Sequence, residues 1–363
     1  MVKKVNKENK KEENKEKETK NKEKVPNYQD QTKFMRRYES LEGFPEIKGY
    51  DFEKPFHFDE FVESYSSMGI QASNLGKAIE IVNEMTDSKA TIFLSCTSNM
   101  ISSGTREIIK FLVKHKFVHV LSMSVGGVEE DIIKCIKPFV AGSFDVPGRV
   151  LFEKGVGRIG NIFAPYDRYL YFEKFMEPLF EGVYKESKKR NKPFTPSEFI
   201  KEMGKEINNE ESIIYWAYKN NIPVFCPALT DGSVGDLFYF QKFNKKDFYI
   251  DVVEDHVKII NLALNSEKTG AIILGGGVAK HYVLNANIFR EGLDYAVYIT
   301  TATEHDASDS GGNQQEAMTW AKIKLNAPNV KVIAEASLVF PLLVAATFAK
   351  RQREDKEEKG GRK

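Results

Sequence analysis

The sequence predicts a doubly wound α/β domain with a mostly parallel sheet. Three observations lead to this prediction: short apolar runs recur along the chain, small or acidic residues follow each run, and most of these turns precede a stretch with helical periodicity. Strands that alternate with helices form parallel sheets covered on both faces. The chain has 363 residues, which is enough for a large domain whose core needs no disulfides.

Six apolar runs are the predicted strands of this sheet. After the first run and the turn 98–104, Ile108, Phe111 and Leu112 recur at helical spacing. The second run is followed by SVGGVEED and by an apolar helical stretch that reaches Ile136. The predicted strands are residues 90–95, 118–123, 222–226, 271–274, 295–299 and 330–334.

Residues 31–349 are predicted to form one domain between two charged tails. Residues 1–30 are a Lys/Glu/Asn tract that cannot bury apolar area, so we expect a solvated, disordered extension; a basic arm that touches RNA or a partner is the alternative. The charged C-terminal tail, residues 350–363, has a similar composition and carries the same expectation. The stretch 165–215, rich in Phe, Tyr, Lys and Glu, is expected to be a helical excursion from the sheet.

The charge of the chain is unevenly distributed. Residues 1–24 carry ten Lys and six Glu, residues 350–363 carry seven basic and four acidic side chains, and the body between them carries 36 basic and 42 acidic ones. A nucleic-acid surface needs the opposite sign, so we expect no nucleic-acid partner. An acidic body is compatible with a cationic ligand.

The cysteines and the apolar runs indicate the cellular compartment in which the protein is expected. Cys96, Cys135 and Cys226 lie far apart and form no C-x-x-C pair, which argues against disulfides and structural zinc and favours a reducing environment. No apolar run approaches the roughly 18 residues of a membrane span, and the N-terminus is charged where a secretion signal would be apolar. We therefore expect a cytoplasmic protein without membrane contact.

Two glycine turns follow predicted strands. Residues 274–278, LGGGV, would let backbone N–H groups approach a phosphate, or would form a tight turn between strand and helix. Gly126 and Gly127 form the second turn, where the carboxylates of Glu129 and Glu130 would repel a phosphate and accept hydrogen bonds from a ribose or an amine. The two turns together favour a dinucleotide.

Acidic residues gather in the turns after the predicted strands, at the sheet edge where ligands bind in open parallel sheets. A divalent metal or an organic polycation could use several of these carboxylates, but no D-x-[DN]-x-[DN]-G loop accompanies them and no metal site is predicted. Singly, each is also an ordinary helix N-cap or turn residue. The set comprises Glu129, Glu130, Asp231, Asp236, Asp306, Asp309, Glu316 and Glu335.

The segment Glu316–Leu325 predicts a helix that is apolar on nearly every side and therefore buried. Lys322 or Lys324 would then be partly desolvated, which suits an amine nucleophile that forms imines; a lysine whose ammonium reaches water is the alternative. Trp320 could stack on a cation or fill the core, and His281 could accept a proton or be a packed polar residue. The chain contains no G-x-S-x-G elbow and no P-loop, which argues against a hydrolase triad and a nucleoside triphosphatase.

Nine segments between Gly49 and Phe348 together resemble deoxyhypusine synthases. The most specific are the stretch around GGGVAKH and the stretch from SDSGG to EAMTWAK. The nine segments are residues 98–107, 124–135, 157–161, 204–212, 227–236, 273–287, 294–312, 316–323 and 336–345.

The resemblance implies a Rossmann-like NAD-binding fold and an NAD-dependent transfer reaction. The aminobutyl group of spermidine would move to one lysine of the translation initiation factor 5A precursor, with release of 1,3-diaminopropane. By its place in TWAK, Lys322 would carry the butylimine, and His281 would accept a proton during dehydrogenation. The family forms homotetramers with active sites at a dimer interface. Residues 56–68 resemble its amphipathic helix that can cover the active-site entrance, although an ordinary packing helix would have the same pattern.

The resemblance also assigns contacts, position by position. The residues that match NAD contacts are Ser98, Asn99, Met100, Ile101, Ser102, Ser124, Val125, Gly126, Glu130, Asp231, Gly276, Thr301, Ala302, Asp306, Glu335 and Ala336. The residues that match spermidine contacts are Glu129, Glu130, Asp236, His281, Asn285, Ala307, Ser308, Asp309, Glu316 and Trp320.

Two positions depart from the family pattern, and both bear on NAD affinity. Ser124-Val125 stands where Thr-Ala is expected, and Glu335 replaces an Asp. Three rival interpretations are a catalytically weak partner subunit that activates a paralogous synthase, a dehydrogenase of a small alcohol or amine, and a polyamine-binding regulatory protein. The retained lysine, histidine and carboxylates argue against the first, and the lysine beside a tryptophan has no use in the second.

Overall fold

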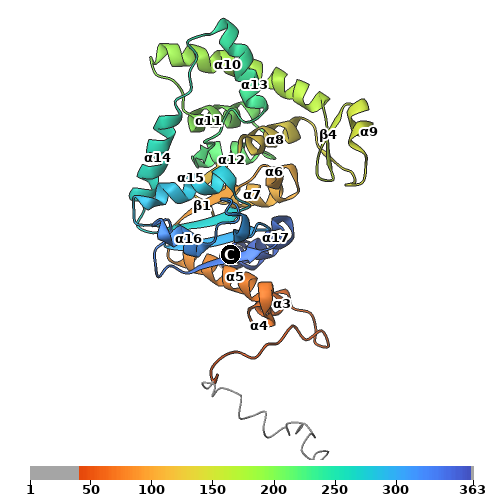
Figure 1. Ribbon diagram of the computed structural model, residues 1–363, viewed down its shortest axis with the longest axis vertical. Helices are drawn as coiled ribbons and strands as arrows, with labels where there is room; N and C mark the ends of the chain where they lie inside the picture. Colours follow the sequence, from red (N-terminus) through yellow and green to blue (C-terminus); the bar gives the residue numbers. More distant parts are fainter. Residues whose placement is uncertain (1–40, 361–363) are drawn as a thin grey trace, which may run out of the picture. The chain divides into compact units, whose positions relative to one another are not determined.

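The computed structural model describes residues 41–360 (Figure 1). The chain divides into two units at Glu46 and Ile47, and the unit that begins at Ile47 contains the sheet and its helices. Of the first unit, the described residues 41–46 are exposed. The expectation for residues 1–30 lies outside the described residues.

The six predicted strands are present and form one parallel sheet. They are β1 (Thr91–Cys96), β2 (Val120–Met123), β6 (Val224–Phe225), β7 (Thr269–Leu274), β8 (Tyr295–Thr300) and β9 (Asn329–Ile333). Their order is β6-β2-β1-β7-β8-β9, with every pair parallel. Numbered along the chain within this sheet, that is the order 3-2-1-4-5-6 of the Rossmann fold. The predicted α/β fold class is therefore confirmed.

The strands are apolar in continuous runs because both faces of the sheet are covered. Ile92 and Leu94 of β1 belong to the larger core cluster, whereas Phe93 faces a second cluster with Ala271 and Ile273 of β7. The helices of the described residues are α3 (Phe58–Glu63), α4 (Tyr65–Met68), α5 (Ile70–Asp87), α6 (Asn99–Ser102), α7 (Thr105–Lys114), α8 (Val125–Ile136), α9 (Gly148–Glu153), α10 (Asp167–Lys189), α11 (Pro196–Ile207), α12 (Ile213–Asn220), α13 (Ser233–Asn244), α14 (Val252–Leu264), α15 (Gly277–Ile288), α16 (Gln314–Thr319), α17 (Ala336–Ala346) and α18 (Phe348–Gly360).

The expected helical excursion is present as α10, α11 and α12, which Figure 1 shows at the end of the unit away from α5. Phe180 of α10 lies edge-on to Phe238 of α13 at 4.7 Å and next to Phe199 of α11 at 5.4 Å. A capping box formed by Thr195 and Glu198 starts α11. The aromatic residues of this stretch therefore pack with Phe238 of α13 as part of the larger core cluster.

A small antiparallel sheet, formed by residues that lie between β2 and β6 in the sequence, was not predicted. Its strands β3 (Val140–Ala141), β5 (Ile162–Pro165) and β4 (Val156–Ile159) lie in that order. Gly160, with φ +59°, makes the tight turn between β4 and β5. The strands are too short to show a clear alternation in the sequence, and the Gly160-Asn161 pair is the signal that could have indicated a hairpin.

The C-terminal tail differs from the expectation of a solvated, disordered extension. Residues up to Gly360 continue as α18, which is anchored at its start because Phe348 is buried and its ring lies 5.2 Å from that of Phe117. Arg351 also forms an ion pair with Asp87 at 2.7 Å. The sequence does not indicate this helix because its residues 353–357 are exposed and polar, so they give no apolar periodicity.

The segment 56–68 is helical, as predicted, but it is divided into α3 and α4 at Ser64. Val62 of α3 is buried, and Tyr65 packs against the main core. These contacts agree with the packing alternative, and the role as a cover of the entrance stays a prediction.

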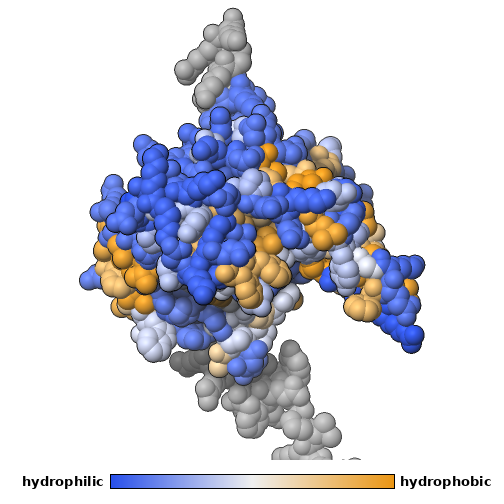
Figure 2. All heavy atoms as spheres, turned by 90° about the horizontal axis from the view of Figure 1, so that it is seen from above, coloured by the Kyte–Doolittle hydropathy of each residue, from blue (hydrophilic) through white to orange (hydrophobic). Residues whose placement is uncertain are grey.

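The surface is mixed in polarity. Figure 2 shows hydrophilic residues across most of one face, with separate apolar patches between them. Exposed apolar side chains are concentrated on α13 and at the start of α14, at Tyr239, Phe240, Phe243, Val252 and Val253. Between residues 41 and 360, no helix combines the length and apolarity needed to cross a bilayer.

Candidate active site

The candidate site lies at the carboxyl edge of the sheet, where the strand order reverses between β1 and β7. Ligands of open parallel sheets bind at this point. The loops that meet here approach closely: a Cβ on Gly275 would lie 2.9 Å from the Thr97 side chain, and a Cβ on Gly276 would lie 2.4 Å from Cα of Ser310. Glycine is therefore required at 275, which has φ +85°, and at 276 because of the neighbouring backbone.

Lys322 and His281 are neighbours although 41 residues separate them. The Lys322 Nζ lies 3.3 Å from Nε2 of His281, and the Nδ1 of the same ring lies 3.1 Å from Nδ2 of Asn285. His281 and Asn285 are four residues apart and share one face of α15. The structure thus places the predicted nucleophile and the predicted proton acceptor in contact and orients the imidazole with an amide.

The prediction of a buried helix around Lys322 is wrong. Helix α16 ends at Thr319, and Ala321 has φ +53°, a left-handed conformation that stops the helix. Trp320 is 63% exposed and Leu325 is 79% exposed, so neither fills the core. Lys322 is half-buried in the following loop, which lets its side chain reach His281.

Lys324, the other lysine of this segment, has a different partner. Its Nζ forms an ion pair with Asp294 at 2.6 Å, away from His281. The two lysines therefore have different surroundings, and the histidine contact distinguishes Lys322.

A hollow beside Lys322 contains several of the residues matched to spermidine contacts. Asp309, Glu316 and Trp320 line it together with Lys280 and Lys322. The Oδ2 atom of Asp309 is buried and has no hydrogen-bond partner within the described part of the chain. A buried acceptor without a donor is costly, so the site suits a ligand that donates hydrogen bonds, such as an ammonium group.

The loop that carries Asp309 is held by two buried lysines that the sequence analysis did not single out. Lys280 donates to the carbonyl oxygens of Asp309 and of Gly312, the latter at 3.0 Å, and burial lowers the pKa of its ammonium. Lys331 donates to the Gly311 carbonyl at 2.7 Å. The position of Lys280 beside His281 in the GGGVAKH segment was the available signal.

A second acidic group follows β2 and β6. Glu129 and Glu130 are buried at the start of α8, and burial raises the pKa of each to about 7. Glu130 accepts a hydrogen bond from the Ser102 hydroxyl. Asp231 and Asp236 are exposed nearby, and their charges add to the raised pKa of Glu129.

Glu129 has a local role that its assignment as a spermidine contact does not include. Its Oε2 accepts the backbone N–H of Val234 at 3.0 Å, and the N–H of Ser233 also contributes. These are free N–H groups of the first turn of α13, so the carboxylate caps that helix. The Oε2 atom of Glu129 is therefore already engaged by the protein.

The residues matched to NAD contacts all follow strands, but only some lie against each other. A Cβ on Gly126 would lie 2.9 Å from Cβ of Ser98, so the loops after β1 and β2 touch. The hydroxyl of Ser124 is buried without a partner among the described residues. The remaining matched residues comprise the α6 segment Asn99, Met100, Ile101 and Ser102, the α8 start Val125, the turn after β8 with Thr301 and Ala302, and the α17 start Ala336.

Two acidic residues matched to NAD contacts have neighbours of their own. Asp306 accepts the N–H of Ser308 at 2.9 Å, which is the turn role that the sequence analysis kept as the alternative. Glu335 lies at the N-cap of α17 and accepts a hydrogen bond from Ser337. Ala307, matched to a spermidine contact, has φ +58° beside this turn.

The two acidic groups are separate within one chain. Among the described residues, no hydrogen bond or ion pair connects the Glu129 and Glu130 group with the Asp309, Glu316 and Lys322 group. The arrangement in one chain therefore offers closely packed loops at the switch point and, separately, a hollow with carboxylates, a tryptophan and a paired lysine and histidine.

The comparisons with known proteins agree with these features. The family model for deoxyhypusine synthase matches residues 60–347. Deoxyhypusine synthases from Senecio vernalis and Arabidopsis thaliana are 47% and 46% identical, over 89% and 90% of this chain and 94% and 96% of theirs. A solved structure from Entamoeba histolytica, described as that of a deoxyhypusine synthase, is 37% identical with a TM-score of 0.61 and covers 84% of this chain and 97% of its own. The chain belongs to the deoxyhypusine synthase family of enzymes.

Proposed function

We propose that this enzyme transfers the 4-aminobutyl group of spermidine to one lysine of the translation initiation factor 5A precursor, in an NAD-dependent reaction that releases 1,3-diaminopropane. The observation that carries the proposal is the Lys322 Nζ, 3.3 Å from Nε2 of His281, at the edge of a hollow with Asp309, Glu316 and Trp320. A transfer through an enzyme imine needs an amine of this kind beside a cation site.

The residues at the switch point fit NAD. Glycines at 126 and 276 keep the loops close, the N-terminus of α8 supplies free backbone N–H groups, and Ser124 has an unpartnered buried hydroxyl. Ser98, Ser102, Thr301 and Glu335 would complete the set of contacts. When bound, NAD accepts a hydride and returns it.

The carboxylates and the indole would hold spermidine. Asp309 and Glu316 would pair with ammonium groups, and the exposed Trp320 would cover the methylenes and attract a cation. This arrangement would place the carbon next to a secondary amine beside His281.

His281 would then transfer protons, and Lys322 would carry the aminobutyl group. The Nε2 atom of His281 faces Lys322 and its Nδ1 atom faces the Asn285 amide, so the ring would exchange a proton with Lys322 through Nε2. Lys322 as a free amine would attack the imine carbon, and diaminopropane would leave. The acceptor lysine would displace Lys322 in a second transimination.

We further propose that the enzyme is a homotetramer with active sites at a dimer interface. Two features support this assembly. The Glu129 and Glu130 group is not connected to the Lys322 group within one chain, and apolar side chains are exposed on α13 and α14. A second copy would bring the two groups together and cover apolar surface.

The proposal is tested by mass spectrometry of the purified precursor after incubation with the enzyme, NAD and spermidine. Lys322→Ala is the test variant, and Lys324→Ala is the matched control because Lys324 is paired with Asp294. We expect an aminobutyl adduct on one lysine that requires NAD, is lost in Lys322→Ala and persists in Lys324→Ala. An adduct that survives Lys322→Ala would refute the assigned nucleophile, and no adduct from a folded, NAD-binding enzyme would favour the partner-subunit interpretation.

A further inference from the structure

Helix α6 (Asn99–Ser102) is only four residues long, and all four of its residues, together with Ser98 at its N-cap, match NAD contacts. In so short a helix, the carbonyl groups at the C-terminal end have no partners within the helix. What holds this end of α6 therefore decides where Ser98 and Ser102 lie.

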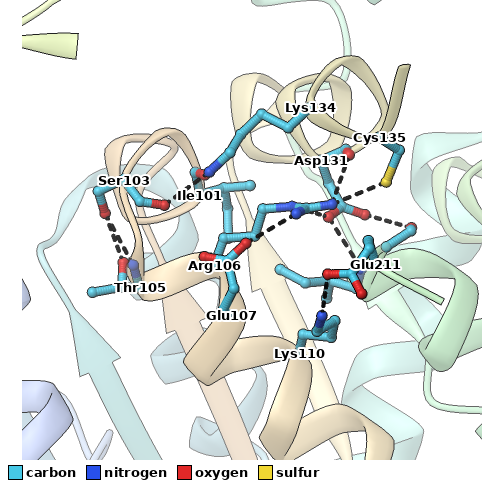
Figure 3. A network of polar contacts seen from close by, with 12 residues as sticks. Ile101, Ser103, Thr105, Arg106, Glu107, Lys110, Asp131, Lys134, Cys135 and Glu211 are labelled. Atoms are coloured by element: carbon cyan, nitrogen blue, oxygen red, sulfur yellow. Dashed lines mark hydrogen bonds and ion pairs between the residues drawn. The ribbon is translucent and has the colours of Figure 1, made fainter. Parts of the chain in front are cut away.

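Lys134 of α8 provides the partners. Its Nζ lies 2.9 Å from the carbonyl oxygen of Ile101, 3.1 Å from that of Ser102 and 2.9 Å from that of Ser103 (Figure 3). An ammonium group has three N–H donors, so these carbonyl groups use the full donor capacity of Lys134. The positive charge also lies at the negative end of the helix.

The same face of α8 makes a second contact with α6. Glu130, four residues before Lys134, accepts a hydrogen bond from the Ser102 hydroxyl. The carbonyl of Met100 accepts one from the Thr105 hydroxyl, so the last carbonyl groups of α6 are all engaged by side chains. The α6 segment is therefore tied to α8 in addition to its own backbone hydrogen bonds, such as those from the N–H groups of Ile101 and Ser102 to the Ser98 carbonyl.

Helix α8 is in turn fixed by a buried ion pair. Arg106 Nε donates to Asp131 at 2.8 Å, and Asp131 also accepts from the Ser212 hydroxyl at 2.6 Å and from the N–H groups of Ile213 and Ile214 at 3.1 Å (Figure 3). These contacts connect α8 with α7 and with the first turn of α12. Lys134 projects from a helix that cannot easily shift.

We infer that Lys134 is a positioning residue for NAD: its ammonium group holds the C-terminal carbonyls of α6 and thereby places Ser98–Ser102 against the dinucleotide. The inference rests on the proposed function for the identity of the ligand. The hydrogen bonds by which Lys134 holds α6 form within the protein and do not depend on which ligand is bound. Glu107, Arg106, Asp131 and Glu130 are the charged groups around Lys134, and none of them replaces its three hydrogen bonds.

The test uses Lys134→Met, which keeps the length of the side chain and removes the charge and the donors. Lys137→Met is the matched control, because Lys137 lies at the end of the same helix in an exposed ion pair with Asp167. The first measurement is amide hydrogen exchange of a peptide covering residues 98–104 in the full-length enzyme without ligands. We expect exchange of this peptide to become at least about tenfold faster in Lys134→Met and to be unchanged in Lys137→Met.

The second measurement is the Kd for NAD by calorimetry, expected to rise by about tenfold or more in Lys134→Met, with partial recovery in Lys134→Arg. Wild-type exchange and wild-type affinity in a folded Lys134→Met enzyme would overturn the inference. If Lys134→Met does not fold, Lys134→Gln, which lacks the charge and has fewer donors, is compared with wild type by the same two measurements, and identity in both overturns the inference. A wild-type enzyme that does not bind NAD would refute the proposed function, while the exchange result would still decide the positioning role.

Discussion

The Arg106–Asp131 pair allows a sharp prediction about stability. The Arg106 side chain is 4% exposed and that of Asp131 is 1% exposed, so solvent screens neither charge. Asp131 accepts four hydrogen bonds, from Arg106, the Ser212 hydroxyl and the N–H groups of Ile213 and Ile214. Burial is the largest single effect on the pKa of Arg106 and lowers it, but the interactions with Asp131, Cys135 and Glu107 together raise that pKa, so the guanidinium is charged in the folded protein.

The perturbation is Asp131→Asn, which keeps the shape of the side chain but replaces one acceptor oxygen with a donor. Removing one partner of a buried ion pair costs about 3–5 kcal/mol because the other charge stays buried without compensation. The new NH2 group also faces donors from Arg106 or from α12. We therefore expect Asp131→Asn to lower the free energy of unfolding by about 3–5 kcal/mol.

Arg106→Met provides an internal comparison. It also leaves a buried charge, but Asp131 retains three donors from the first turn of α12. Its cost is expected to be the smaller of the two, about 1–3 kcal/mol.

The assay is urea unfolding at a fixed protein concentration. It is followed by the fluorescence of Trp216, which lies on α12 and donates to the Glu210 carbonyl at 2.8 Å. A loss below about 1 kcal/mol for Asp131→Asn, or a larger loss for Arg106→Met, would refute the reasoning that the buried charge dominates.

Three further predictions concern the candidate site. Burial raises the pKa of Glu130 from its ordinary value of about 4.5 to about 7, so the folded enzyme holds this proton more tightly than the unfolded chain, and stability falls as pH rises from about 4.5 to about 7. Glu130→Gln should flatten that part of a profile of melting temperature against pH, and an unchanged slope would contradict the raised pKa. Gly276→Ala should lose most activity, because the added Cβ would lie 2.4 Å from Cα of Ser310; wild-type turnover would show that the loop tolerates displacement. Trp320→Ala should leave stability within about 0.5 kcal/mol of wild type, since the indole is 63% exposed, and should raise the KM for spermidine; an unchanged KM would remove Trp320 from the polyamine site.

The sequence by itself determined the class of fold. Strands buried on both faces are apolar in continuous runs, and this local pattern identified all six parallel strands and the turns that follow them. The motifs around Lys322 and His281 were equally local, and they indicated the family before any geometry was known.

Other features depended on contacts between residues distant in sequence, which only the tertiary structure decided. The strand order that creates the switch point, and the contact of Lys322 with a histidine 41 residues away, depend on how the helices pack. The end of α16 at Thr319 went against apolar periodicity, since a left-handed residue is not visible in a hydrophobic pattern. Lys134 looks like an ordinary charged residue in the sequence, and the contact of Glu129 with α13 is not visible there either. Both contacts exist because the free backbone groups of α13 and α6 lie within reach of these side chains.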